Sequence, residues 1–397
     1  MSIFSKLFHS RQPKQTTAAV MAGGAPFFSP FGGSAYENDV FRSSVDAIAR
    51  HGAKLHGSHI ICTAGGRQPG DDTLNYLLGA RPNPYMSAYD ALYKMITHYF
   101  TNNDSFGYMQ RDDSGSVAAF YPLDITGMQF VSDAADTLYC KFFFQNGKQY
   151  ILPYSDTLHL RRHFNHNDLL GDNNLAILPA LQLAKAQSDG IQSGIKQGAS
   201  LRGILKYNQV LAADKLKEEK DNFMADYLSI PNNGGIAALD SKLDYVPLDS
   251  KPYTIDDKQL SAVQNKICAY LGISPEIVSG NYTEQQGTAF YESVIEPLAA
   301  QMGQEFTAKI FTPIEQQAGN KIIFEGNDLD YASYTTRVSV IQQTAPYGIM
   351  TIDECREALN MKPIGGDEGA KRLQTLNVVD ATKANNYQLG GNSNEGK

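Results

Sequence analysis

Three histidines in one short stretch are the residues of this chain that most suggest metal chemistry. His159, His163 and His166 lie within HLRRHFNH, and Asp156 and Asp168 flank them. Imidazoles bind zinc, and three of them around a bound water make a hydrolytic centre. The stretch itself contains no carboxylate, however, and HExxH is absent from the sequence. We therefore favour a strand end and a turn with surface histidines, and keep a metal-dependent hydrolase as the alternative.

Other catalytic patterns are missing or stand where acidic residues have structural roles. The sequence has no GxSxG nucleophile elbow and no Walker A motif, which excludes an ATPase motor. Acidic pairs lie in turns or at helix starts, where carboxylates stabilise the positive end of the helix. These pairs are Asp71-Asp72, Asp112-Asp113 and Asp256-Asp257. We predict a chain that is not an enzyme and that needs no metal or cofactor.

A polar loop followed by a helix with an internal proline is the most informative pattern. Ser274-Pro275-Glu276 has the composition of a helix start. A polar segment between Gly280 and Gly287 follows, and an apolar-periodic helix then begins near Thr288. Pro297 lies inside that helix, where it removes a backbone donor and clashes with a preceding carbonyl. The sequence therefore predicts a loop that leads into a kinked helix.

The elements around this pattern predict an α+β fold. A helical stripe covers residues 36–57, and a second helix over 87–100 begins at a Ser87–Asp90 capping box. Short β-rich runs then follow, and Asn146-Gly147 predicts a hairpin turn. The predicted strands are Val117–Tyr121, Met128–Val131, Leu138–Phe144 and Tyr150–Leu152.

Two long helices bracket a small insertion in the middle of the chain. The first helix covers residues 175–200 and the second 254–271, with Thr254 and Asp257 as a cap pair. Between them we expect a strand at 201–208, a charged helix at 209–228, and strands over 234–247 with a turn near Asp240.

The C-terminal part is predicted to be mainly helical, and both ends of the chain to be irregular. A strand at 321–325 precedes a helix at 330–344, and Thr351 with Glu354 forms a capping box that opens another helix. Residues 10–35 are rich in Gly, Pro, Ser and Thr, and residues 381–397 are rich in Asn and Gly.

Composition limits the classes of function. The 397 residues carry a net charge of -8, which argues against a basic stripe that holds nucleic acid by its phosphates. The 4 cysteines show no CxxC spacing, as expected of free thiols in a reducing compartment. The sequence has no long apolar run for a membrane span, and its first residues do not form a secretory signal.

Four segments, taken in order, resemble the portal proteins of tailed double-stranded-DNA bacteriophages. Leu74–Tyr93 resembles the early signature of that family, and Gly203–Leu205 after the long helix resembles the approach to its clip. Leu271–Leu298 resembles its tunnel loop and kinked helix, and Gly348–Gly369 its C-terminal signature. The resemblance spans residues 36–376. One departure is Ser105-Phe106-Gly107-Tyr108, where the family often has Gly-Asn-x-Tyr.

The resemblance implies a portal fold with a wing, a two-helix stem, an inserted α/β clip, a tunnel loop on a kinked helix, and a helical crown. The implied divisions are a flexible arm at 1–35, wing at 36–172, stem helix at 173–200, clip at 201–252, stem helix at 253–272, tunnel loop, kinked helix and wing return at 273–329, crown at 330–380, and disordered tail at 381–397.

The resemblance also implies a function and its residues. Portal proteins form a ring of about twelve subunits at one capsid vertex, pass DNA in packaging and ejection, and bind terminase, capsid or scaffold protein and a head-completion adaptor. The virion, and the host cytoplasm during assembly, are the implied locations. The predicted channel loop is Asn281, Tyr282, Thr283, Glu284, Gln285 and Gln286, with the kink at Pro297. Lysines predicted as candidates to face the channel are Lys185, Lys196, Lys258 and Lys266.

Overall fold

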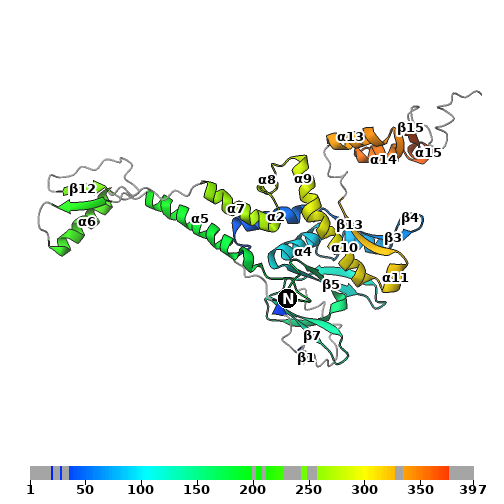
Figure 1. Cartoon of the computed structure of the whole chain (residues 1–397), viewed down its shortest axis with the longest axis horizontal. Helices are drawn as coiled ribbons and strands as arrows, with labels where there is room; N and C mark the ends of the chain where they lie inside the picture. Colours follow the sequence, from blue (N-terminus) through cyan, green and yellow to red (C-terminus); the bar gives the residue numbers. More distant parts are fainter. Residues whose placement is uncertain are drawn as a thin grey trace, which may run out of the picture. The chain divides into compact units, whose positions relative to one another are not determined.

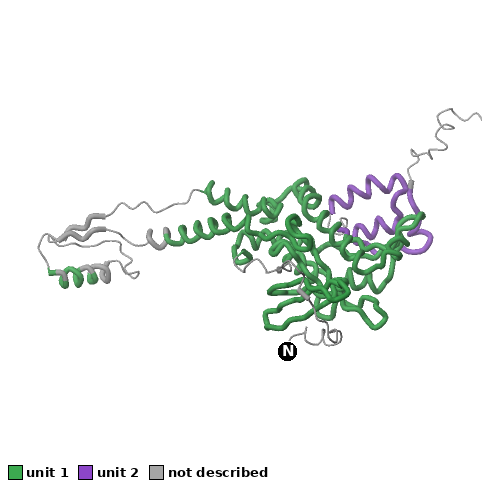
Figure 2. Tube along the Cα trace, turned by 60° about the horizontal axis from the view of Figure 1, so that its bottom comes forward, with its two compact units in different colours: residues 1–324 green, residues 325–397 purple. Residues whose placement is uncertain are grey.

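The computed structural model describes residues 19–20, 27–28, 35–198, 203–207, 212–227, 243–247, 257–326 and 334–374. The chain divides into two compact units, residues 1–324 and residues 325–397 (Figure 2). Both units contain helices and strands, so the predicted α+β class is confirmed. No helix among the described residues is long and apolar enough to cross a membrane.

Two antiparallel-sheet layers and a helical layer build the core of the first unit. Helices α2 (Asp39–Gly52) and α4 (Ala88–Asn102) pack on each other and begin at side-chain caps, Asn38 and the predicted Ser87–Asp90 capping box. The helix predicted over 36–57 ends earlier, at Gly52, because strand β3 takes over at His56.

The central sheet has the strand order β10-β5-β6, with β5 at Asp104–Arg111, β6 at Val117–Pro122 and β10 at Thr157–Arg161. Its side chains alternate between two apolar clusters. Leu158 and Met109 belong to the core shared with the helices, whereas Phe106 and Tyr121 belong to a second core under the next sheet. The sheet therefore lies between helices and a second sheet. Strand β5 was not predicted, whereas β10 matches the strand end predicted before the turn in HLRRHFNH.

The second sheet contains β7 (Gly127–Ser132), β8 (Leu138–Phe143) and β9 (Gln149–Pro153), joined as antiparallel neighbours. The predicted Asn146-Gly147 turn joins β8 to β9, and Gly147 has a φ of 74° there. Strands β1 (Ala19–Val20) and β2 (Phe27–Phe28) pair with β7. Those four residues of the predicted flexible arm are therefore strand; the remaining residues before Ala35 lie outside the described part.

A third sheet joins distant parts of the sequence, in the order β13-β3-β4. Strand β3 (His56–Thr63) pairs with β4 (Gly66–Pro69), and β13 (Asn320–Glu325) contains the predicted 321–325 strand. Helices α3 (Asp72–Gly79) and α11 (Pro313–Gln317) complete this region.

Helices α5 (Leu178–Gly198) and α7 (Asp257–Leu271) lie side by side in both views (Figures 1 and 2), and a short helix η2 (Asn174–Ile177) precedes α5. Between them in sequence, β11 (Gly203–Tyr207) pairs with β12 (Leu243–Pro247), and α6 covers Ala213–Tyr227. The predicted strand at 201–208, the helix at 209–228 and the last of the strands predicted over 234–247 are thus present in shorter form, while residues 228–242 lie outside the described residues. The turn near Asp240 and the cap at Thr254 lie outside the described residues.

The second unit contains α13 (Tyr334–Thr344), β14 (Tyr347–Thr351), α14 (Ile352–Ala358), α15 (Gly366–Gly369) and β15 (Arg372–Gln374). The predicted Thr351–Glu354 capping box opens α14. Asp353 accepts hydrogen bonds from the backbone N–H groups of Ile364 and Gly365, at 2.7 Å and 2.9 Å, and so holds the turn that follows α14. The predicted 381–397 tail lies outside the described residues.

Candidate functional site

A short loop and a helix interrupted by a π turn occupy the predicted region, but the boundary between loop and helix differs from the prediction. Helix α8 (Pro275–Ser279) begins where the sequence predicts and ends at Gly280 in the left-handed conformation. Helix α9 then begins at Glu284, four residues before the predicted start at Thr288, and it ends at Phe290. Only Asn281, Tyr282 and Thr283 therefore form the loop.

A capping box accounts for this difference. The Gln286 backbone N–H donates to Thr283 Oγ1 at 3.3 Å, and the Thr283 backbone N–H donates to Gln286 Oε1 at 2.8 Å. These two bonds satisfy orphan donors at the start of a helix. Glu284, Gln285 and Gln286 are thus the first turn of α9 and not loop residues. The Thr-x-x-Gln pattern was visible in the sequence and could have shown the true start.

The aromatic residue of the loop is held by its neighbours. Tyr282 Oη lies 3.3 Å from Nε2 of His51, on α2. The Tyr282 ring also covers Gly287, where an added Cβ would lie 3.0 Å from Tyr282 Cε2. Phe290 meets the same histidine ring edge-on, at 5.4 Å between centroids. His51 was not predicted as a site residue, because no local pattern links it to a loop 231 positions away.

The bend predicted at Pro297 takes the form of a π-helical turn. Residues Tyr291–Ile295 form this turn, η3, between α9 and α10 (Glu296–Ile310), and Pro297 lies in the first turn of α10. The Glu296 backbone N–H donates to the Tyr291 carbonyl, five residues back. Because proline lacks a backbone N–H and crowds the carbonyl four residues before it, a wider turn just before Pro297 accommodates it. The helical pattern is therefore interrupted by a π turn just before Pro297.

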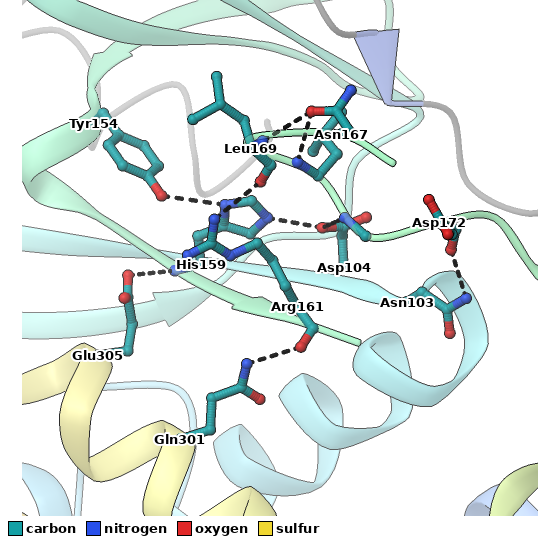
Figure 3. Close-up of polar contacts among 12 residues, drawn as sticks. Asn103, Asp104, Tyr154, His159, Arg161, Asn167, Leu169, Asp172, Gln301 and Glu305 are labelled. Carbon is teal, nitrogen blue, oxygen red and sulfur yellow. Dashed lines mark hydrogen bonds and ion pairs between the residues drawn. The ribbon is translucent and has the colours of Figure 1, made fainter. Parts of the chain in front are cut away.

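Buried polar groups attach the far half of the bent helix to the central sheet (Figure 3). His159, on β10, is fully buried, and its Nε2 lies 2.8 Å from Asp104 Oδ1. A carboxylate only accepts, so Nε2 carries the proton and Nδ1 accepts from Tyr154 Oη at 3.3 Å. Burial lowers the pKa of His159 despite the neighbouring Asp104 carboxylate.

Helix α10 contributes its own side chains to this network. Glu305 Oε1 accepts from the His159 backbone N–H at 3.0 Å, and Gln301 donates to the Arg161 carbonyl at 2.8 Å (Figure 3). Lys309 Nζ donates to the Tyr154 carbonyl at 2.6 Å and lies 3.5 Å from the centroid of that ring. Burial raises the pKa of Glu305 and lowers that of Lys309, while each partly offsets the shift of the other.

These positions do not support the metal-dependent hydrolase. Both ring nitrogens of the buried His159 are already hydrogen-bonded, one to Asp104 and the other to Tyr154. His163 has a φ of 53° in the following turn, and the His166 side chain is 82% exposed. Among the described residues no group of three or more His, Cys, Asp or Glu side chains could hold a metal ion. The favoured interpretation was also wrong for His159, which is not a surface residue.

The predicted lysines lie on the paired helices. Lys185 is exposed on α5, and Lys258 and Lys266 are exposed on α7. Lys196 is also in α5, but its side chain lies outside the described part of the structure. The two helices meet through apolar residues such as Leu181 and Val263, and through Gln187, whose amide donates to the Gln259 carbonyl at 3.4 Å.

Relatives of this chain were found at the level of sequence. A family model described as "Phage portal protein" matches residues 39–360. The portal protein of Enterobacteria phage HK97 is 20% identical over 322 residues, which cover 77% of this chain and 73% of that protein. The probable portal protein of Lactococcus phage p2 is 22% identical over 207 residues. This chain spans about half the length of that relative, 54% of it, and the match covers 50% of this chain.

Solved structures share the fold. The neck of a native gene transfer agent particle, computed with C12 symmetry, has a chain with a TM-score of 0.58 and 17% identity, covering 83% of this chain and 92% of that chain. A portal protein of the HK97 family from Corynebacterium diphtheriae has a TM-score of 0.51 and 11% identity, covering 75% of this chain and 96% of that chain.

The family match includes the loop, the π-bent helix α9–α10 and the buried network that fixes it, and it confirms the resemblance read from the sequence motifs. This chain belongs to the phage portal protein family.

Proposed function

We propose that copies of this chain form a ring whose central channel passes double-stranded DNA at one vertex of a phage capsid, during packaging and ejection. The observation that carries the proposal is the family match over residues 39–360, which includes the loop and the bent helix. Neck structures of similar fold computed with C12 and C6 symmetry support a ring, and twelve copies in the virion. The role is structural, and the host cytoplasm would be the place of assembly.

We assign the parts of the portal fold to elements of this chain as follows. The paired helices α5 and α7 suit the stem, and β11, α6 and β12 suit the clip, which we propose as the docking site for terminase and a head-completion adaptor. The three sheets around α4 suit the wing, and residues 330–380 the crown. The arm at 1–35 and the wing would meet capsid or scaffold protein.

The loop and the first turn of α9 suit weak contact with moving DNA. Asn281, Glu284 and Gln285 are exposed, and together they carry one negative charge and no positive charge. Such a surface can exchange hydrogen bonds with phosphates but does not displace their counterions, which is the source of tight electrostatic binding. The exposed lysines of α5 and α7 would supply a modest attraction elsewhere in the channel, with Lys196 as a further candidate.

Electron microscopy of the purified protein tests the ring. Negative staining, with light scattering for mass, is expected to show rings of about twelve subunits around a central hole. Compact monomers or dimers at every concentration, including in the presence of capsid or scaffold protein, would contradict the proposal.

A charge substitution tests the loop. In Asn281→Arg/Glu284→Arg/Gln285→Arg, three guanidinium groups per copy would bind phosphate and slow DNA in the channel. We expect rings to form normally and the DNA content per particle to fall several-fold. The matched control is Gln68→Arg/Gln149→Arg/Gln317→Arg, at exposed positions on β4, β9 and α11. Equal DNA content in the two variants would contradict the proposal that the loop contacts DNA in the channel.

A further inference from the structure

The tyrosine of the loop is bound back onto the body of the protein, where a residue that meets DNA would be expected to project. Its hydroxyl lies 3.3 Å from Nε2 of His51, and its ring meets the imidazole edge-on, with centroids 6.2 Å apart. The Tyr282 side chain is 39% exposed, although it lies in a three-residue loop that follows a left-handed glycine. A ring held in this way positions the loop.

The hydrogen-bonding roles of the pair follow from the other nitrogen of the imidazole. His51 Nδ1 lies 2.8 Å from the carbonyl oxygen of Ala47, one turn earlier in α2. A carbonyl only accepts, so Nδ1 carries the proton and Nε2 of the neutral ring is an acceptor. Tyr282 Oη is therefore the donor. Burial lowers the pKa of His51, which keeps the ring neutral at pH 7.

The anchor beneath this pair is rigid. His51 is in the last turn of α2, where Phe41, Val45 and Ile48 are completely buried. Phe290 packs against the imidazole from α9, at 84° to its plane. The histidine is thus fixed by a core helix on one side and by the helix that carries the loop on the other.

Glycine at position 287 makes room for the tyrosine ring. A Cβ built there would lie 3.0 Å from Tyr282 Cε2 and 3.3 Å from Cδ2, which is closer than side chains usually approach. The φ of Gly287 is not in the left-handed region, so the backbone conformation does not require glycine at this position. The space that the Tyr282 ring needs does account for it.

We propose that His51, Tyr282 and Gly287 form a latch that holds the loop against α2 and sets its resting position. Tyr282 and His51 are positioning residues, and Thr283 with Gln286 fixes the adjoining helix start. The side chains left to meet DNA are then Asn281, Glu284 and Gln285. This assignment of contact residues rests on the proposed channel function, whereas the latch itself does not.

Hydrogen exchange of the loop amides in the full-length protein tests the latch. The Asn281 backbone N–H donates to the Glu276 carbonyl at 3.0 Å, and this bond must open for the amide to exchange. Tyr282→Phe keeps the ring and removes the donor, and His51→Phe keeps a ring and removes the acceptor. Because one hydrogen bond contributes about 0.5–1.5 kcal/mol, each variant should speed exchange over residues 280–283 about twofold to tenfold.

Three further variants separate a latch from general loosening. The double variant His51→Phe/Tyr282→Phe should exchange no faster than either single variant, because both remove the same bond. His51→Gln, which restores an acceptor, should return exchange toward the wild-type rate. Tyr85→Phe, at a tyrosine 60% exposed in a different loop, should have no effect. Unchanged exchange in both single variants, or additive effects in the double variant, would overturn the latch.

Gly287→Ala adds a steric test. The new methyl group should push the Tyr282 ring away by a few tenths of an ångström and so raise loop exchange. A failure of the channel function can be distinguished from a failure of the latch. In that case the latch variants would still alter hydrogen exchange as expected. The DNA content per particle, however, would stay at the wild-type level in the latch variants and in the triple-arginine loop variant.

Discussion

The two ends of the bent helix are held in different ways. At the α10 end, Glu305 and Lys309 reach a network around His159 that is excluded from water. At the α9 end, the side-chain hydrogen bond that ties the loop to α2, from Tyr282 to His51, is 3.3 Å long and accessible to solvent. The π turn at Tyr291–Ile295 lies between these two regions.

One end of the helix is therefore held strongly, and the other end is held by a contact that can break and re-form. A buried polar network is costly to break, because each group that loses its partner keeps its desolvation penalty. A bond exposed to water is replaced by water at little cost, so the latched loop can leave and return. In this chain the helix thus has a fixed base at one end and an exchangeable contact at the other.

Breaking the buried end by mutation should give the largest effect. In Asp104→Ala, the buried His159 Nε2–H and the partly buried Gly171 backbone N–H both lose their acceptor. We expect the free energy of unfolding of the first unit to fall by about 3 kcal/mol, measured by urea titration with tyrosine fluorescence.

The chain contains a matched control for this prediction. The second pair, His166 with Asp172, has the same 2.8 Å separation, but the His166 side chain is 82% exposed. His166→Ala should leave the unfolding midpoint almost unchanged, since exposed pairs contribute little. Equal losses in the two variants would show that burial does not distinguish the regions.

Acid should weaken the first unit without any mutation. His98, on α4, has its pKa lowered to about 4, chiefly by burial and then by Lys94. The unfolded state takes up a proton near pH 6.5 and the folded state does not, so stability falls as pH drops through that range. From pH 7 to pH 5, His98 should account for a loss of about 2 kcal/mol.

His98→Gln measures this contribution directly. The variant should show a flatter dependence of unfolding free energy on pH between 7 and 5 than the wild-type protein does. Burial lowers the pKa of His159 as well, so some loss on acidification should persist in the variant. Parallel curves for the two proteins would contradict the assignment to His98.

Local sequence patterns predicted local structure well. The Ser87–Asp90 and Thr351–Glu354 capping boxes form as predicted, because all of their bonds lie within one helical turn. The Thr283–Gln286 box has the same form, but the polar composition between Gly280 and Gly287 predicted a loop there instead of a helix start. In this stretch the capping pattern is a better guide to the helix boundary than polarity.

Long-range partners could not be predicted from spacing alone. Strands β5 and β10 contain Asp104 and His159, polar residues that usually mark a surface, and only their mutual contact makes burial favourable. His51 and Tyr282 are likewise 231 positions apart. The kink at Pro297 was predicted because proline acts locally, whereas its form as a π turn depends on how both helix halves pack.

Weakening the start of α9 should have a smaller effect, confined to the adjustable end. In Thr283→Ala, the Gln286 backbone N–H loses its capping acceptor, which costs about 1 kcal/mol of local helix stability. Amides of residues 284–287 should exchange about fivefold faster, while the unfolding midpoint of the first unit stays nearly constant. Thr351→Ala, which removes the equivalent cap of α14, is the control, because it should leave exchange at 284–287 unchanged.

Replacing the proline should change stability least and geometry most. In Pro297→Ala, the restored N–H favours a regular helix, while the more flexible unfolded chain offsets part of that gain, so we expect a net change below about 1 kcal/mol. Loss of the π turn would rotate α9 relative to α10, since a π turn holds one extra residue, and would separate Tyr282 from His51. Hydrogen exchange over residues 280–283 should therefore be faster in Pro297→Ala than in the wild-type protein. An unchanged exchange rate would mean that packing around α9 and α10, and not the proline, sets the bend and with it the position of the loop.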